Sequence, residues 1–474
     1  MSDSAATAFD LGFGSLGAEV SDRTLSVEGT VPGWLSGALI RNGPGKFEFG
    51  GRRVSHWFDG LALLRRYGFD DGIVTYTSRF LRTEAYRNAT EGSGAKAGEF
   101  ATDAGPLRTA LRWLRSFGPP EPTDNANVHV ARFGDHCVAL TEAPRRVAFD
   151  PETLETRGEF RWTDDLTEHL TTAHVRVDPH RGETIGYSTE LGRSPAYHLY
   201  RIPDGQAGRE PIASVPAVGP GYVHDCSITA SYVVLVETPL RIALLRALLP
   251  GSEGLLGMLE YDGERRSRFV VVDRDSGTVV AEPRVPPFFT FHHVNAYESD
   301  GEIVVDLVAF EDDGILEAMS FDSLSGGAFD GAPDGRLDRY RLDLESETAS
   351  RSRRYDGGLE LPTVPRAVRG RPYRYAYAQA TDRSGANGLV KVDVERETAT
   401  EWWERGVYVE EPRMVRRPGG TDEDDGVVLA PALDTKRERS VLLIFDAETL
   451  TELARAPLPH AVPFGFHGRF FPAQ

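Results

Sequence analysis

Four of the twelve histidines stand in sequence contexts that set them apart from the rest. They are His174 in TTAHVRVDP, His224 in GYVHDCSIT, His292 in FTFHHVNAYE and His467 in PFGFHG. Each is flanked by strand-forming or aromatic residues and is followed within a few positions by a turn. Because imidazole is a common metal ligand, these histidines are candidates for a metal site. They are too widely spaced to come from one helix or loop, so they can meet only if distant strands point toward a common axis.

The cysteines narrow the choice of metal ligands. The chain has only two, Cys137 and Cys226. Two cysteines can pair with each other, but they cannot build a disulfide framework or a thiolate metal site in a chain of this length. A metal bound here would therefore need histidine or carboxylate ligands.

One short pattern recurs: alternating apolar residues, an aspartate, a few turn-forming or polar residues, and a second strand-like run. An aspartate that ends a strand can accept hydrogen bonds from the following backbone N–H groups, so each copy predicts a β-hairpin. The copies are centred on Asp150, Asp178, Asp273, Asp343, Asp393 and Asp446. Their irregular spacing favours an all-β fold, a β-propeller whose blades carry insertions of different length, with a two-sheet sandwich as the alternative. In a propeller the last strand often closes the ring against the first blade, which would keep PFGFHG ordered near a terminus that would otherwise fray.

Composition excludes several classes of protein. No apolar run approaches the roughly 20 residues that cross a bilayer, so we do not expect a transmembrane protein. The N-terminal segment MSDSAATAFDLGFGS lacks the basic and apolar regions of a secretory signal, which predicts a cytoplasmic location. The formal net charge is −19, from 72 acidic and 53 basic residues, so nucleic acid is not an expected partner. Only four of the basic residues are lysine, a pattern typical of proteins from salt-loving microbes or from GC-rich genomes.

Two stretches break the β pattern. In residues 105–119, GPLRTALRWLRSFGP, leucines fall on one helical face and arginines lie on its flank. Residues 239–261 contain two leucine-rich segments separated by Pro250 and Gly251. Both stretches are too short to cross a membrane. They are candidates either for a helical cap packed on the propeller or for contact with an anionic lipid surface.

Several longer motifs occur in a fixed order: LSGALIRNGPGKFEF at 35–49, SHWFDGLALLRRYGF at 55–69, YTSRFLRTEAY at 76–86 and the final PFGFHG. With these motifs the chain resembles the carotenoid cleavage oxygenase family over nearly its whole length. The resemblance implies a single domain spanning residues 1–474, a seven-bladed β-propeller with a small helical or loop cap over its metal-bearing face.

The resemblance also implies the site. The family holds one Fe(II) on the propeller axis with four histidines, which match His174, His224, His292 and His467 here. It places a glutamate behind three of these histidines. The matching motifs are ALTEAPRR, LELPTVPR and DEDDGVVL, which assign the three roles to Glu142, Glu360 and Glu423.

The implied activity is dioxygenation, with O₂ as co-substrate and no organic cofactor. The substrate would be a carotenoid or apocarotenoid, cleaved at a conjugated C=C bond into two carbonyl products, with retinal among the candidate products. Such a substrate resides in membranes, which suggests peripheral membrane contact. The alternatives are cleavage of stilbene-type phenylpropanoids or isomerisation without oxygen on the same scaffold, and a metal-free propeller that serves as a binding module. The oligomeric state and the bond that is cleaved stay open.

Overall fold

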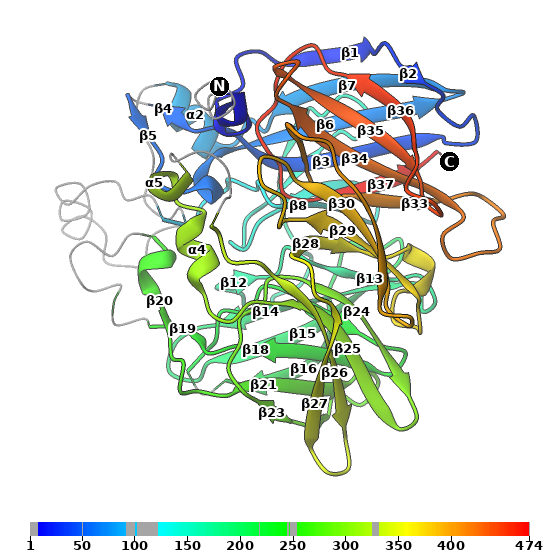
Figure 1. Ribbon diagram of the computed structural model, residues 1–474. Coiled ribbons are helices and arrows are strands. Elements are labelled where there is room, and N and C mark those ends of the chain that lie inside the picture. The colour runs from blue at the N-terminus through cyan, green and yellow to red at the C-terminus, as the bar shows by residue number, and fades with distance from the viewer. Residues whose placement is uncertain are drawn as a thin grey trace.

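The structure is a computed structural model that describes residues 8–49, 51–91, 100–101, 122–217, 219–243, 246, 254–324 and 331–473. Within these ranges seven antiparallel sheets of four or more strands form the blades of a β-propeller (Figure 1). The seven-bladed fold expected from the resemblance is therefore confirmed.

The blades are numbered here in chain order, and the innermost strand of each is named first. Blade 1 contains β37 (Gly468–Pro472), β3 (Gly37–Lys46), β6 (Leu61–Asp70), β7 (Ile73–Phe80) and β1 (Val20–Thr24). Blade 2 contains β8 (His129–Phe133), β9 (His136–Leu140), β10 (Arg146–Phe149) and β11 (Thr156–Phe160). Blade 3 contains β13 (Arg176–Asp178), β12 (Leu170–Thr171), β14 (Glu183–Glu190), β15 (Ala196–Pro203) and β16 (Glu210–Pro216).

The remaining four blades follow the same plan. Blade 4 contains β17 (Cys226–Ile228), β18 (Tyr232–Glu237), β21 (Ser267–Asp273), β22 (Val279–Ala281) and β23 (Arg284–Val285). Blade 5 contains β24 (His293–Ser299), β25 (Glu302–Ala309), β26 (Arg336–Asp343) and β27 (Thr348–Tyr355). Blade 6 contains β28 (Leu359–Thr363), β29 (Tyr375–Ala380), β30 (Gly388–Asp393) and β31 (Thr398–Trp402). Blade 7 contains β33 (Arg413–Arg416), β32 (Val407–Val409), β34 (Gly426–Asp434), β35 (Arg439–Asp446), β36 (Glu452–Pro457) and β2 (Glu28–Gly29).

The aspartate turns predicted from the sequence join paired antiparallel strands at all six positions. At Asp150, Oδ1 accepts hydrogen bonds from the backbone N–H groups of Glu152 (2.9 Å) and Thr153 (2.8 Å). The same capping occurs at Asp178, Asp273, Asp343, Asp393 and Asp446. A further turn of this kind at Asp434, between β34 and β35, was missed by the sequence pattern. These local bonds stop each strand and reverse the chain.

Both ends of the chain take part in ring closure. The C-terminal strand β37 pairs with β3, so one blade combines the two ends, as expected for a closing strand (Figure 1). The N-terminal strand β2 also pairs with β36 of blade 7. Hydrophobic clusters then join adjacent blades: Leu39 and Leu63 of blade 1 share a cluster with Leu429 and Leu442 of blade 7. Closure therefore rests on both backbone pairing and burial of apolar surface.

The innermost strands meet around the propeller axis. Contacts between neighbouring blades link β13 with β17, β17 with β24, β24 with β28, β33 with β37, and β37 with β8. Residues at the start of these strands therefore face one another although they are far apart in the sequence. The functional histidines lie at this level.

Short elements cover one side of the ring (Figure 1). They are α2 (Glu84–Thr90), α4 (Gly314–Ala318), α5 (Phe321–Leu324), the β4 (Glu48–Phe49) and β5 (Arg52–Arg53) hairpin, and the 3₁₀ turns η1 (Asp10–Phe13) and η2 (Trp57–Asp59). Ile315 and Leu316 of α4 belong to the same buried cluster as Phe291, which precedes His292. Phe321 of α5 shares a cluster with Phe466, which precedes His467. The cap therefore lies over the face that carries the histidines.

The two stretches proposed as helical differ in outcome. Residues 105–119 lie outside the described residues. In the segment 239–261, the described parts form a hairpin of β19 (Leu240–Ile242) and β20 (Leu259–Tyr261), with the 3₁₀ turn η4 (Leu256–Met258) before β20. The helical prediction is wrong for these parts, because Leu240, Ile242 and Leu259 alternate with outward residues on a two-stranded ribbon that packs on the propeller. None of the described helices is long and apolar enough to cross a membrane.

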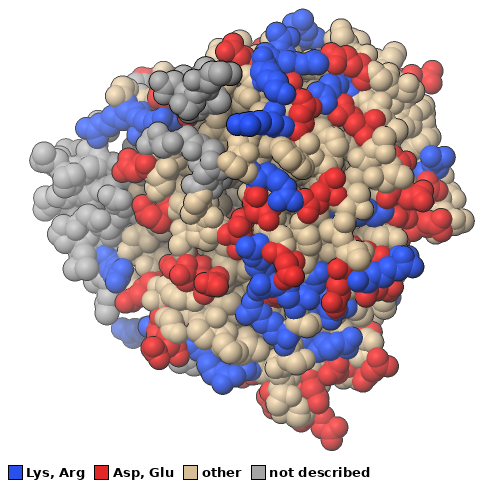
Figure 2. All heavy atoms as spheres, viewed as in Figure 1, with Lys and Arg blue, Asp and Glu red and all other residues tan. Residues whose placement is uncertain are grey.

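The visible surface mixes charges of both signs. Figure 2 shows Lys and Arg interspersed with Asp and Glu over this face, with few areas of one sign alone. The acidic excess is therefore spread over the face, and many of its members sit beside arginines.

Candidate metal centre

The four histidines selected from the sequence converge on the axis. One nitrogen of each of His174, His224, His292 and His467 lies within 4.8 Å of one nitrogen of every other, and all four residues are buried. The ring of His174 lies 4.4 Å from that of His467 and 4.5 Å from that of His224, centroid to centroid. Four imidazoles this close together in a protein interior form a donor set for one metal ion.

Strand position explains the convergence. His174 and His224 each stand two residues before an innermost strand, β13 and β17, while His292 and His467 each stand one residue before β24 and β37. The propeller brings these strand starts together at one end of the axis. Four separate blades thus supply one histidine each to the cluster, which spacing along the sequence alone cannot reveal.

Three glutamates lie directly behind three of the histidines. The Nδ1 atom of His224 is 2.6 Å from Glu142 Oε1, and that of His292 is 2.6 Å from Glu360 Oε2. The Nδ1 atom of His467 is 3.0 Å from Oε1 of Glu411. A carboxylate accepts from an Nδ1–H group, so these contacts fix the tautomer in which Nε2 carries the free lone pair.

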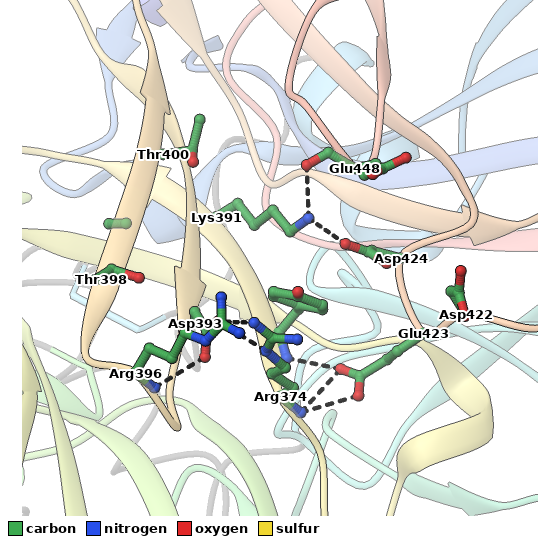
Figure 3. Close-up of a pocket in the computed structure, with 12 residues that line it drawn as sticks. Arg374, Lys391, Asp393, Arg396, Thr398, Thr400, Asp422, Glu423, Asp424 and Glu448 are labelled. Carbon is green, nitrogen blue, oxygen red and sulfur yellow. Dashed lines mark hydrogen bonds and ion pairs between the residues drawn. The ribbon is translucent and has the colours of Figure 1, made fainter.

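The assignment of Glu423 to this role is wrong. Its carboxylate accepts hydrogen bonds from the backbone N–H groups of Arg374 (2.9 and 3.2 Å) and Tyr375 (2.7 Å), away from every histidine of the cluster. Glu423 instead lines a separate polar pocket of about 530 Å³. Figure 3 shows it there beside Arg374 and Asp422. The motif DEDDGVVL was the wrong acidic stretch because it precedes β34, whereas Glu411 precedes the innermost strand β33 by two residues.

Glu411 is held by two arginines as well as by His467. Its carboxylate forms ion pairs with Arg41, which is fully buried, and with Arg413 (2.6 Å), and it accepts a hydrogen bond from the backbone N–H of Gly468 (2.9 Å). Burial opposes the charge of Glu411, but Arg413, His467 and Arg41 outweigh it and lower its pKa well below the usual value. Glu411 is therefore an anion that can orient the His467 ring.

The segment PFGFHG is fixed from several directions. Arg41 Nη2 donates to the carbonyl of Phe466 (3.0 Å), and the backbone N–H of Gly465 donates to Glu410 (2.9 Å). Glu410 in turn forms two short hydrogen bonds with Arg65, at 2.6 and 2.7 Å. A Cβ atom on Gly465 would lie 1.8 Å from Arg65 Nη2, so only glycine allows this approach. The early motif that contains Arg41 thus anchors the last histidine.

The remaining polar atoms fit a metal. The Nε2 atoms of His174 and His292 are buried and have no hydrogen-bond partner among the described residues, although buried polar atoms are normally satisfied. Burial and the neighbouring histidines lower the pKa of His174, and burial lowers the pKa of His467 to about 4 despite Glu411. Burial also opposes protonation of His292, but the adjacent Glu360 outweighs it and raises the pKa. The site thus offers imidazole lone pairs to an electron-deficient ion, and the residues present fit that ion.

Aromatic rings lie beside the nitrogen cluster. Phe291 lies 5.1 Å from the His224 ring, and Phe58 contacts Phe291 (6.3 Å), Phe100 (5.0 Å) and Phe466 (5.3 Å), all measured between ring centroids. Phe291 and Phe466 are buried and Phe58 is partly exposed. This aromatic group suits an apolar, planar substrate next to the metal.

Two residues of the site were missed by sequence reasoning. One is Glu411, whose signal was its place two residues before a strand, the same offset as His174 and His224. The other is His129, the first residue of β8, whose ring lies 5.4 Å from that of His467 and 5.7 Å from that of His174. His129 is a neighbour of the donor set and not a member of it.

Comparisons with known proteins agree with this geometry. Residues 13–472 match the family described as RPE65, retinal pigment epithelial membrane protein. Carotenoid cleavage dioxygenase 8 of Arabidopsis thaliana is 32% identical over 479 residues, which cover 94% of this chain and 83% of the relative. The β,β-carotene 15,15'-dioxygenase of Mus musculus is 30% identical, over 94% of this chain and 88% of its own.

Solved structures are similar over the whole length. Cobalt-substituted Synechocystis apocarotenoid oxygenase has a TM-score of 0.88 and 28% sequence identity, and the match covers 99% of each chain. The fold, the four-histidine donor set and the sequence match all lead to the same assignment. The chain belongs to the retinal pigment epithelial membrane protein family, the family of the carotenoid oxygenases.

Proposed function

We propose that this protein is a non-haem Fe(II) dioxygenase that cleaves a conjugated C=C bond of a carotenoid or apocarotenoid into two carbonyl products. O₂ is the co-substrate and one iron is bound per chain. The observation that carries the proposal is the donor set: four buried imidazoles, three of them backed by glutamates, in a member of the carotenoid oxygenase family. Relatives named as carotenoid cleavage dioxygenases support the substrate class.

His174, His224, His292 and His467 would hold the metal through nitrogen. When bound, Fe(II) supplies the activation of O₂, because four nitrogen ligands leave up to two of six octahedral positions open. The chain's own contribution is orientation. Glu142, Glu360 and Glu411 hold three rings in one tautomer, and the hydroxyl of Tyr222 donates to Glu142 at 2.8 and 2.9 Å, which fixes that carboxylate in turn.

The aromatic group positions the substrate. A polyene that lies along Phe58, Phe100 and Phe291 presents its π-face to rings and not to water, and this excludes water from the reacting bond. Cleavage position then depends on which double bond lies beside the metal, a positioning effect. The retinal-forming reaction is one case of this scheme, in which the central bond occupies that place.

Substrate supply involves a membrane surface in this proposal, since carotenoids reside in lipid. Leu255 and Leu256 lie just before β20 and are partly exposed. The backbone N–H of Leu256 donates to the carbonyl of Phe100 (2.8 Å), which belongs to the aromatic group. A leucine pair next to that group suits an entry patch. Leu256→Glu should lower both liposome binding and turnover of liposomal substrate while turnover of detergent-dispersed substrate stays near wild type. Equal loss with both substrates would reject the entry role.

The proposal is tested by product mass spectrometry. The iron-loaded protein is incubated with β-carotene and a series of shorter apocarotenals in detergent, with air or under nitrogen, beside a His292→Ala variant. We expect oxygen-dependent aldehydes whose chain lengths identify the bond, and no product from the variant. Products without oxygen would indicate an isomerase, and cleavage of stilbenes alone would indicate a phenylpropanoid enzyme. If the protein binds no iron and forms no product, the result would favour a metal-free propeller that serves as a binding module.

A further inference from the structure

A second cluster of charged groups lies on the same axis, one step beyond the metal centre. Along a strand, residues i and i+2 share a face and are about 6–7 Å apart. Two residues after His174, Glu411 and His467 stand Arg176, Arg413 and Arg469. Three innermost strands, β13, β33 and β37, therefore each carry an arginine next to the residues of the metal centre. We call these residues, with Arg366 and Arg369, the axial arginine cluster.

Arg366 and Arg369 come from the turn that follows β28. The 3₁₀ turn η5 (Arg366–Val368) is tied to blade 5, because the side-chain amide of Asn295 donates to the carbonyls of Val368 (2.9 Å) and Arg371 (3.0 Å). It is also tied to blade 3 by a 2.8 Å contact between His180 Nε2 and the carbonyl of Ala367. The turn thus reaches from blade 6 to blades 5 and 3 at the far end of the innermost strands.

The cluster has more cations than carboxylates. Arg176 forms an ion pair with Asp225, and Arg413 forms one with Glu411 (2.6 Å). Glu411 also contacts Arg41 and His467, so its charge is shared among three partners. The other three arginines, Arg366, Arg369 and Arg469, have no acidic partner within 4.0 Å anywhere in the described ranges. In a chain of formal charge −19, a local excess of positive charge at the axis is unexpected.

Two guanidinium atoms are buried without a partner. The Nε–H groups of Arg369 and Arg413 are inaccessible and donate to no acceptor among the described residues, although Arg413 Nη1 does donate to Thr363 Oγ1 (3.2 Å). Burial and the charges of Arg176, Arg413, Arg469 and Arg366 lower the pKa of Arg369. Arginine nevertheless stays protonated in proteins, so the repulsion cannot be relieved by losing a proton.

We propose that the axial arginine cluster binds one small oxyanion of the sulfate, phosphate or carboxylate class between η5 and the innermost strands. A planar guanidinium fork matches two oxygens of such an anion, and charge-assisted hydrogen bonds of this kind are the strong ones. A bound oxyanion gives the buried N–H groups acceptors and offsets the like charges. This site is separate from the metal centre, and its existence does not depend on the proposed reaction.

Sulfate is the probe of choice, because phosphate complexes iron. Isothermal titration of sulfate into the iron-loaded protein, at fixed ionic strength set with chloride, should show one saturable site per chain. Arg369→Gln and Arg469→Gln should each weaken sulfate binding roughly tenfold or more, the loss expected for one charge-assisted hydrogen bond. The matched control is Arg161→Gln, an exposed arginine on the surface, which should bind sulfate as wild type does.

Thermal unfolding gives an independent readout. Without a binding anion, Arg369→Gln should melt higher than wild type, since it removes one of several repelling charges. Millimolar sulfate should raise the Tm of wild type and of Arg161→Gln clearly more than that of Arg369→Gln. The proposal is overturned if wild type shows no saturable sulfate binding, if binding survives in both cluster variants, or if Arg369→Gln is less stable than wild type with and without sulfate.

Discussion

Two glutamates only twelve positions apart in the sequence have different contacts, because the fold places them at different ends of one strand. Glu411 and Glu423 flank one strand of blade 7, yet Glu411 contacts His467 while Glu423 binds the backbone of blade 6. Glu411 is buried and Glu423 is half-buried, and their pKa values move in opposite directions. Arg413, His467 and Arg41 lower the pKa of Glu411 against its burial, whereas burial raises that of Glu423. Of the two, only Glu411 lies behind a histidine of the cluster.

We predict that Glu411→Gln lowers iron affinity roughly 10- to 100-fold, the usual effect of removing a carboxylate behind a ligating histidine. Competition with a chelator measures the affinity, and circular dichroism checks that the variant is folded, because the change also leaves Arg41 and Arg413 short of a partner. Glu423→Gln is the matched control and should bind iron as wild type does. Equal losses in the two variants would contradict the role assigned here to Glu411.

A second residue-scale prediction concerns His56, which is fully buried under the cap. Its Nε2 donates to the carbonyl of Leu316 (3.0 Å) and its Nδ1 accepts from the Phe58 N–H (3.2 Å), so the ring is held neutral. Burial lowers its pKa to about 4 from 6.5. Below pH 6.5 the unfolded chain takes up a proton that the folded chain refuses, so stability present above that pH is lost as the pH falls toward 4.

The loss amounts to about 3 kcal/mol at about 1.4 kcal/mol per pKa unit. We expect wild type to lose up to that much more stability than His56→Gln between neutral pH and pH 4, since glutamine keeps a donor near the Nε2 position but does not titrate. Urea unfolding of the metal-free proteins at several pH values measures the difference. His174 and His467 also titrate, but they do so in both proteins, so their contribution cancels in the comparison. Parallel pH curves for the two proteins would reject the assignment.

The sequence predicted the four clustered histidines but not all of their surroundings, for a physical reason. The four histidines stand in distinctive motifs, whereas Glu411 lies in the plain run EEPR, and its role depends on which acid the start of β33 places on the axis. The positions of His129 and of the axial arginine cluster could not be predicted from the sequence either, because they depend on how strands from different blades pack together. Periodicity reports one strand at a time and says nothing about which strands meet.

At the scale of elements, the aspartate turns were predictable because each is local. The backbone bonds are made within four residues, and the residue four after the aspartate adopts a positive φ in every copy. Glycine fills this place at 182 and 277, and other residues fill it elsewhere, including Leu154 (φ 59°) and Glu438 (φ 49°). The irregular insertions hid the blade boundaries. The leucines of 239–261 suggested a helix because periodicity alone cannot assign a short, leucine-rich run to a strand or a helix.

Glu438→Gly should therefore stabilise the protein by about 1 kcal/mol, because glycine reaches the left-handed region without the cost that a Cβ atom imposes. Glu438 is exposed, so little packing is lost. Leu154→Gly tests the same backbone position with the opposite outcome, since Leu154 is fully buried and its loss should cost about 2–5 kcal/mol. Urea unfolding measures both, and a less stable Glu438→Gly would show that φ strain is not what limits this turn.

The closing segment PFGFHG gives a second prediction for an element. Gly465→Ala places a methyl group within 3.0 Å of Glu410 and closer still to Arg65, so one of these buried partners must move. We expect a lower Tm and weaker iron binding, because His467 stands two residues further on. Gly17→Ala, where a Cβ atom meets nothing within 4 Å, is the control. Normal iron affinity in Gly465→Ala would mean that the ion network holds the strand but not the ligand.

For the whole molecule, the question is whether net charge or ion pairs set the response to salt. The formal charge of −19 favours expansion by self-repulsion, which screening relieves. Opposing this, many arginines pair with carboxylates at the surface, as Arg66 does with Glu152 and Arg437 with Glu28 (2.7 Å), and screening weakens such pairs. Exposed pairs are worth only about 0–1 kcal/mol each, and many contribute nothing measurable.

We therefore expect repulsion to dominate, so that Tm rises steadily as KCl is added. The rise should be parallel in wild type and Arg369→Gln, because it comes from the whole surface and not from the axial arginine cluster. Differential scanning calorimetry of the iron-loaded proteins, with sucrose as an uncharged control, separates screening from general exclusion of solute. A Tm that falls with KCl would show that ion pairs outweigh the acidic excess, and it would remove the physical basis for reading the composition as an adaptation to salt.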